Sequence, residues 1–130
     1  GGGILNDGGT LTISGNTTIS NNTANRAGGG IEVTGGTINT ITGATISSNS
    51  VGVSPAVAAP GNGGGIHVGG DGQLTISGGS VTGNSAALEG GGLWNGSGLM
   101  TINGTTITGN TALGDELRWF GGNYRNNDLR

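Results

Sequence analysis

Gly28-Gly29-Gly30-Ile31 and Ile46-Ser47-Ser48-Asn49-Ser50-Val51 decide the fold, because both stretches recur along the chain. The first motif, three glycines before Ile or Leu, occurs four times, with starts separated by 27, 35 and 27 residues. The second motif, [Ile/Val]-[Ser/Thr]-x-Asn-[Ser/Thr]-[Ala/Val], follows each triplet: 21 residues separate the first Gly from the Asn in three units and 20 in the fourth. Two motifs that recur together at a nearly constant offset indicate a solenoid of stacked coils.

A third short segment lies between the two motifs in every unit. It reads Leu11-Thr12-Ile13, Leu74-Thr75-Ile76 and Met100-Thr101-Ile102, whereas Ile38-Asn39-Thr40-Ile41 is spaced differently and predicts a bulge or small register change. Apolar and polar residues alternate in these segments, which is typical of strands with one buried face. We therefore predict an all-β fold: a right-handed parallel β-helix, or solenoid, of about four coils, with roughly 27 residues and three short strands per coil.

The repeat sets the predicted boundaries. The coils span 1–27, 28–62, 63–89 and 90–112, and the length variation lies between the Asn and the next Gly triplet. We expect a corner insertion at 52–62 and an irregular tail at 113–130, which is either a cap or the start of a fifth coil. Four interior ladders are expected: Ile4, Ile31, Ile66 and Leu93; Ile13, Ile41, Ile76 and Ile102; Ile19, Ile46, Val81 and Ile107; and a narrow corner of Ala24, Val51, Ala86 and Ala112.

One asparagine per unit marks a turn in this scheme. Asn tolerates left-handed backbone angles, and its amide can bond to the turn backbone or to the Asn of the next coil. We interpret four residues as turn and ladder residues rather than ligands: Asn22, Asn49, Asn84 and Asn110.

Composition excludes several classes of protein. Gly accounts for 33 of the 130 residues but is clustered, unlike the regular Gly of collagen. Only 8% of residues are charged and there is no Lys, so no basic surface exists for nucleic acid or anionic lipid. Cys is absent, which excludes disulfides and thiolate metal sites, and no apolar run is long enough to span a bilayer.

The two motifs together resemble those of right-handed parallel β-helix surface proteins. Gly-Gly-Gly-Ile followed by Ile-x-x-Asn is similar to the polymorphic outer-membrane protein repeat, although Ile or Val stands here where that family has Phe. It looks closer to large bacterial surface proteins whose coils read Gly-Gly-Gly-Ile-Tyr-Asn and Ser-Gly-Asn-Thr-Ala. The resemblance covers residues 1 to about 112 and implies secretion, an extracellular or cell-surface location and a structural or adhesive role, without catalytic residues.

Residues capable of catalysis or metal binding are few and scattered. The carboxylates occupy different coil positions, Gly69-Gly70-Asp71-Gly72 matches a calcium-binding repeat only once, and His67 is the only His. We therefore predict no catalytic residues, cofactor or metal. The acidic residues are Asp7, Glu32, Asp71, Glu89, Asp115, Glu116 and Asp128.

Two outward-facing sets could contact partners. The position after the inward Ile or Leu carries His67 and Trp94, and an alignment of Phe120-Gly121-Gly122 with the triplet adds Tyr124, which gives a candidate glycan or partner contact. Thr12, Thr75 and Thr101 are candidates for an ice-binding ladder, although Thr also suits any exposed strand.

The leading hypothesis is a structural or adhesive β-solenoid segment of an extracellular bacterial surface protein, and the alternatives are a carbohydrate-binding or carbohydrate-active β-helix and an ice-binding solenoid. The expected partner is another copy stacked end to end into fibres, or the rest of a longer β-helix. Surface glycans are a further candidate partner, and neither nucleic acid binding nor membrane insertion is expected.

Overall fold

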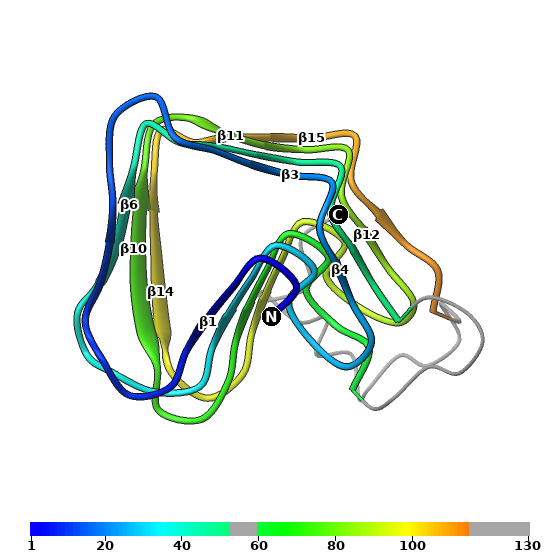
Figure 1. Cartoon of the computed structure of the whole chain (residues 1–130), viewed down its shortest axis with the longest axis horizontal. Coiled ribbons are helices and arrows are strands. Elements are labelled where there is room, and N and C mark those ends of the chain that lie inside the picture. Colours follow the sequence, from blue (N-terminus) through cyan, green and yellow to red (C-terminus); the bar gives the residue numbers. More distant parts are fainter. Residues whose placement is uncertain (53–59, 115–130) are drawn as a thin grey trace.

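The computed structural model describes residues 1–52 and 60–114, and within them every regular element is a β-strand. The strands form four parallel sheets, each with one strand from every coil, so the predicted solenoid of about four coils is confirmed. We name the sheets A to D in the order in which each coil passes through them. In Figure 1, sheet A (with β1), sheet B (with β6) and sheet C (with β3) form three sides of a triangle, and sheet D (with β4) continues from the end of sheet C. Sheet A contains β1 (Ile4–Asn6), β5 (Ile31–Val33), β9 (Ile66–Val68) and β13 (Leu93–Asn95).

The other three sheets follow in the same order along each coil. Sheet B contains β2 (Leu11–Ile13), β6 (Asn39–Thr42), β10 (Gln73–Ser77) and β14 (Leu99–Asn103). Sheet C contains β3 (Thr18–Ser20), β7 (Thr45–Ser47), β11 (Ser80–Thr82) and β15 (Thr106–Thr108). Sheet D contains β4 (Thr23–Ala24), β8 (Ser50–Val51), β12 (Ser85–Ala86) and β16 (Thr111–Ala112). Each coil thus has four strands rather than the predicted three, because the narrow corner forms its own parallel ladder.

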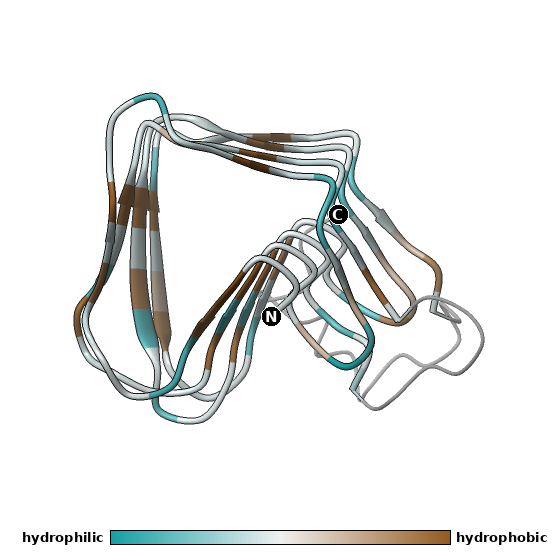
Figure 2. Cartoon of the chain, viewed as in Figure 1, coloured by the Kyte–Doolittle hydropathy of each residue, from teal (hydrophilic) through white to brown (hydrophobic). Residues whose placement is uncertain are grey.

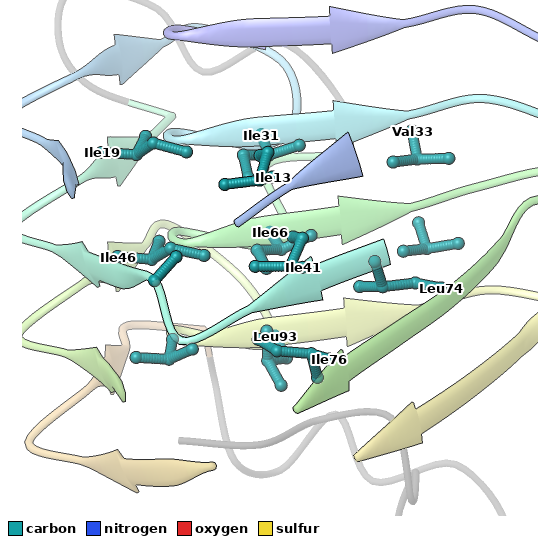
Figure 3. Packing of buried hydrophobic residues seen from close by; sticks show 13 residues of the cluster. Ile13, Ile19, Ile31, Val33, Ile41, Ile46, Ile66, Leu74, Ile76 and Leu93 are labelled. Carbon is teal, nitrogen blue, oxygen red and sulfur yellow. The ribbon is translucent and has the colours of Figure 1, made fainter. Parts of the chain in front are cut away.

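The four predicted interior ladders are confirmed by strand register. Ile4 pairs with Ile31, Ile13 with Ile41, Ile19 with Ile46, and Ala24 with Val51, and the same columns continue through the later coils. Apolar residues form continuous bands across the stacked strands (Figure 2), and their side chains pack together inside the triangle (Figure 3). Burial is complete in the middle of the stack, but in sheet B it falls in the fourth coil: Ile76 is 1% exposed and Ile102, its neighbour in the same ladder, 36%, whereas Leu93 in sheet A of the fourth coil stays fully buried.

The irregular spacing in the second coil leaves the sheet B register intact. Ile41 pairs directly with Ile13 and Ile76, so no bulge interrupts these strands. The connection before this strand has six positions in the second and third coils, from Val33 to Asn39 and from Val68 to Leu74, and five in the first coil, from Asn6 to Leu11. Because Asn39 pairs with Leu11, it occupies an inward position, where it is buried, and Ile38 is exposed.

Hydrogen bonds satisfy the polar side chain of the inward-facing Asn39. Its amide donates to the carbonyl oxygens of Gly36 (3.0 Å) and Gln73 (2.8 Å), and its Oδ1 accepts a bond from Asn6 Nδ2. A buried polar group costs little when it is satisfied in this way.

The Gly triplets pack against sheet D with no room for side chains. A Cβ on Gly29 would lie 2.3 Å from the carbonyl oxygen of Gly64 and 2.6 Å from that of Ser50. A Cβ on Gly64 would meet the Gly91 and Ser85 carbonyls in the same way. The glycines therefore allow the chain entering sheet A to lie directly against the strand that leaves the Asn turn.

The predicted insertion includes residues that belong to the stack. Gly61 N–H donates to the carbonyl oxygen of Arg26 (2.7 Å), and Asn62 forms a parallel bridge with Ala27. Gly52 N–H likewise donates to Ala24 (2.9 Å). Residues 53–59 of the insertion and 115–130 of the tail lie outside the described residues.

Candidate functional site

The four ladder asparagines lie one above another and are bonded in series. Asn22 Nδ2 donates to Asn49 Oδ1 (3.0 Å), Asn49 Nδ2 to Asn84 Oδ1 (2.9 Å), and Asn84 Nδ2 to Asn110 Oδ1 (3.0 Å). Each acceptor oxygen also receives the backbone N–H of the preceding ladder asparagine. Asn49 and Asn84 are 0% and 1% exposed, so this ladder is part of the interior.

The left-handed residue of each turn is the one before the ladder asparagine. Asn21 and Ser48 have φ values of 57° and 55°, and Gly83 and Gly109 take the same conformation. The expectation that the ladder asparagines themselves adopt the left-handed backbone conformation is therefore wrong. The amide is needed there for its bonds to neighbouring coils, such as Asn84 Nδ2 to the Ile46 carbonyl (2.9 Å).

A second group of polar residues lines the outer face of sheet A. Glu32, His67 and Trp94 are neighbours in register, on the opposite face from the core residues Ile66 and Val68. His67 faces away from the core as predicted, but it is only 5% exposed. The turn before the strand lies close to it: a Cβ on Gly63 would lie 2.7 Å from His67 Cβ.

His67 is held by stacking rather than by hydrogen bonds. Its ring is parallel to that of Trp94, with a centroid separation of 4.6 Å and an interplanar angle of 7°. Both ring nitrogens are buried and have no hydrogen-bond partner among the described residues. Burial, with the positive charge of Arg26 as a smaller cause, lowers the pKa of His67 to about 4, so the ring is neutral at neutral pH.

The charged residues beside this stack are already paired. Arg26 forms an ion pair with Oε1 of the buried Glu32, whose Oε2 lies 2.7 Å from the amino group of Gly1. Glu89 Oε2 accepts a hydrogen bond from Trp94 Nε1 (3.1 Å). Tyr124, the third residue of the predicted glycan contact, lies outside the described residues. The described part of this group therefore offers the partly exposed Trp94 as its main contact for a ligand.

Hydroxyl groups cover the outer face of sheet C and form one full column on that of sheet B. Thr12, Thr75 and Thr101 fall in one column of sheet B, which Thr40 completes. Sheet C is more regular, because both of its outward columns contain only Ser and Thr: Thr18, Ser20, Thr45, Ser47, Ser80, Thr82, Thr106 and Thr108. The signal for this face was present in the sequence as [Ser/Thr]-[Ile/Val]-[Ser/Thr] before every ladder asparagine, but sequence analysis singled out only the sheet B threonines.

The described residues contain no group of three or more His, Asp or Glu side chains arranged to hold a metal ion. Asp71 lies in the turn between β9 and β10, and Asp7 accepts a hydrogen bond from Thr34 Oγ1 (2.7 Å) in the corresponding turn after β1. In the same part of the chain, no helix capable of crossing a membrane is found.

Comparison with known proteins adds no identity to this geometry. No protein family, curated protein or solved structure matches the chain.

Proposed function

We propose that this chain is a structural and adhesive β-solenoid segment of an extracellular bacterial surface protein. The observation that carries the proposal is the use of both recurrent motifs in contacts between coils. The Gly triplets of neighbouring coils touch, since a Cβ on Gly30 would lie 2.8 Å from the Gly65 carbonyl oxygen, and the Asn turns are bonded, with Asn49 Nδ2 donating to Asn84 Oδ1 (2.9 Å). A chain built in this way forms a rigid stack that lengthens by about 4.8 Å per coil.

The adhesive part of the proposal is supported by repetition on the outer faces. Each coil presents Ser or Thr at the same positions of sheets B, C and D, so a weak contact made by one coil is available to every coil. Linked weak contacts strengthen one another through their high effective concentration. The extracellular location rests on the resemblance of the repeats to those of bacterial surface proteins.

Adhesion can be tested with microspheres that carry the chain covalently. The microspheres would flow over glass coated with bacterial or plant polysaccharide or with mucin, and their retention would be compared with that of microspheres carrying Ile76→Asp. We expect retention on at least one surface with the wild-type chain only, because Ile76→Asp places a carboxylate in the core. Equal retention of both chains, or retention of neither on any surface, would overturn the adhesive role.

A second candidate function, ice binding, is favoured by the outer face of sheet C. The strands of sheet C run along one straight side of the cross-section (Figure 1), and their eight outward Ser and Thr residues form two columns from coil to coil. Among them, only Ser20 Oγ has a protein hydrogen-bond partner in the described chain, Asn21 Nδ2 at 3.5 Å. Hydroxyls both donate and accept, and Thr side chains are stiff, so this uncharged face suits an ordered layer of water.

Ice recrystallisation in the presence of the protein tests this second candidate. Thr82→Lys would place a long charged side chain in the middle of the sheet C face, and Thr75→Lys would do the same on sheet B as a matched control. If sheet C binds ice, only Thr82→Lys loses inhibition. Inhibition that is absent from the wild type, or lost only in Thr75→Lys, would exclude the sheet C face.

Carbohydrate binding at Trp94 is the remaining alternative. One face of the indole is covered by His67, which leaves less of the ring for sugar stacking than sequence analysis expected. A glycan array probed with wild-type chain and Trp94→Ala tests it directly. Binding that disappears in the variant would support this alternative, and unchanged or absent binding would exclude it.

A further inference from the structure

We infer that the outer face of sheet B binds a neutral, extended polysaccharide, with the sugar chain running along the stack of coils. The inference rests on the proposed adhesive role and gives that role a partner of defined chemistry. It begins with two apolar side chains that the fold leaves outside: Ile38 is 58% exposed and Leu99 is 61% exposed. Each directly precedes an inward residue of sheet B, Asn39 or Met100, and therefore faces outward.

The two exposed side chains lie in one column of sheet B, two coils apart. Gln73 pairs with Leu99, and it stands 35 positions after Ile38, the same offset that joins Thr40 to its partner Thr75. An exposed amide therefore separates two exposed apolar side chains, with about 4.8 Å between neighbouring coils. In an extended β-1,4-linked glycan the rise per sugar is close to this spacing, and the same ring face recurs at every second sugar. The column thus offers an apolar contact at the period of one ring face.

Polar groups that can bind sugar hydroxyls lie in and beside this column. The next outward column of sheet B contains only threonines: Thr12, Thr40, Thr75 and Thr101. Threonine hydroxyls and the Gln73 amide both donate and accept hydrogen bonds, as sugar hydroxyls do. Within the described chain, none of these side chains is engaged in a hydrogen bond. The face therefore combines apolar contacts for the C–H groups of sugar rings with donors and acceptors for their hydroxyls.

The distribution of charge selects a neutral sugar chain. Among the described residues, no outward position of sheet B carries a charge. Asp71 is exposed in the turn that leads into Gln73, and Asp7 lies in the corresponding turn of the first coil. The carboxylates of an acidic polysaccharide would approach these two aspartates without a basic partner, because Arg26, the one Arg in the described ranges, is ion-paired with Glu32.

The apolar side chains also distinguish this face from that of sheet C. Covering Ile38 and Leu99 with sugar rings removes apolar surface from water, which the all-hydroxyl columns of sheet C cannot do. Each coil adds only a weak contact, but one polysaccharide chain that spans several coils makes these contacts together.

Depletion of the full chain from solution by insoluble polysaccharides tests the inference. Amorphous cellulose and chitin are the neutral probes, and cross-linked polygalacturonate is the acidic probe. The variants are Ile38→Ser and the double variant Ile38→Ser/Leu99→Ser, and Leu5→Ser is the matched control because Leu5 is also 58% exposed but belongs to sheet A. Circular dichroism establishes that each variant folds. Thr75→Lys, which places a long side chain beside the column, is a second blocking variant that does not depend on the folding of the double variant.

We expect at least one neutral probe to deplete the wild type and Leu5→Ser, with binding about tenfold weaker in the double variant and an intermediate loss in Ile38→Ser. Thr75→Lys should also bind more weakly than the wild type. Equal binding of Leu5→Ser and the double variant would overturn the assignment to sheet B, as would binding that is lost only in Trp94→Ala.

The partner chemistry is decided by the probes. Depletion by polygalacturonate that equals or exceeds depletion by the neutral probes would overturn the neutral partner, as would the absence of depletion by both cellulose and chitin. Microspheres retained on mucin, without depletion by either neutral probe, would overturn this inference and leave the adhesive role standing. Depletion by a neutral probe without retention of microspheres on any surface would do the reverse, so the two proposals can fail separately.

Discussion

The two inner coils and the two outer coils share the same motifs but differ in how completely those motifs are buried. Ile31 and Ile66 of the inner coils are fully buried, whereas Ile4 of the first coil is partly exposed. Asn49 and Asn84 have ladder neighbours on both sides, whereas Asn22 and Asn110 have one each within the described chain. A repeat in a solenoid thus owes much of its stability to its neighbours.

A second difference concerns the inward position at the end of each sheet A strand. The inner coils place Val33 and Val68 there, and the outer coils place Asn6 and Asn95. The outer asparagines close the following turn: Asn6 Nδ2 donates to Gly9 O (3.0 Å), and Asn95 Nδ2 donates to Gly98 O (2.9 Å). Apolar side chains therefore occupy this column where coils cover it on both sides, and polar side chains occupy it next to the ends.

The largest expected difference between inner and outer coils is in the sheet B ladder. Ile76→Asp should unfold the chain, because a buried, unpaired carboxylate costs more than about 4 kcal/mol. Ile102→Asp should cost about 1–2 kcal/mol, because that side chain is already 36% exposed and the carboxylate can remain hydrated. Thermal unfolding followed by circular dichroism compares them, and equal losses would show that the outer coil is as closed as the inner one.

The asparagine ladder should show the same contrast on a smaller scale. Asn84→Ala removes the acceptor of Asn49 N–H and Nδ2 and the donor to Ile46 O, which should cost about 3 kcal/mol since these groups are buried. Asn22→Ala removes only the Nδ2 bond to Asn49, whose Oδ1 keeps the backbone N–H of residue 22, and should cost about 1 kcal/mol. Urea unfolding measures both, and similar costs would contradict the direction assigned to the ladder.

The sequence predicted the contacts of the inward-facing residues better than the other contacts of the fold. Ile, Val and Asn recur at fixed offsets, so the register of Ile46 with Val81 could be read from spacing alone. Sheet D was missed because its strands have two residues, too few to show alternation. A bulge or register change was expected at Ile38-Asn39-Thr40-Ile41 because its apolar residues are spaced differently, whereas the strand keeps its register and buries the hydrogen-bonded Asn39.

The burial of the sheet A outer face could not have been predicted from the sequence. Alternation correctly put His67 on the opposite face from Ile66, and an outward residue is ordinarily exposed. The preceding turn instead brings Gly63 close to His67 Cβ, a contact between residues four positions apart whose geometry depends on the whole corner. Stacking with Trp94 adds a partner from the next coil.

The burial of His67, a residue of an inner coil, predicts that the free energy of unfolding depends on pH. The folded pKa of His67 is about 4, below the 6.5 of the unfolded chain, so the unfolded state takes up the proton first. Stability is therefore complete above pH 6.5 and falls as the pH drops toward 4, by at most about 2 kcal/mol at pH 5. Urea unfolding of wild type and His67→Phe at pH 7 and pH 5 isolates the contribution of His67 to this pH dependence, since Phe keeps an aromatic stack without a titrating group.

The wild type should lose more stability than His67→Phe over that interval, because the carboxylates titrate in both chains. An equal loss would mean that His67 is not buried in solution. A greater loss in the variant would reverse the sign of the predicted linkage.

The smallest expected effect comes from making the second coil as short as its neighbours. Deletion of residues 53–60 joins Gly52 to Gly61 and leaves Val51-Gly52-Gly61-Asn62 in place of the stretch that reads Ala24-Asn25-Arg26-Ala27 in the first coil. Both retained glycines already bond to the first coil, Gly52 to Ala24 and Gly61 to Arg26, so the flanking hydrogen bonds persist. Loop length contributes slowly to the entropy of closure, and the shorter coil should be equally stable or more stable by about 1 kcal/mol. A melting temperature that falls well below that of the wild type would show that the insertion contributes contacts of its own, and deletion of residues 53–59 alone, which keeps Pro60, would then locate them.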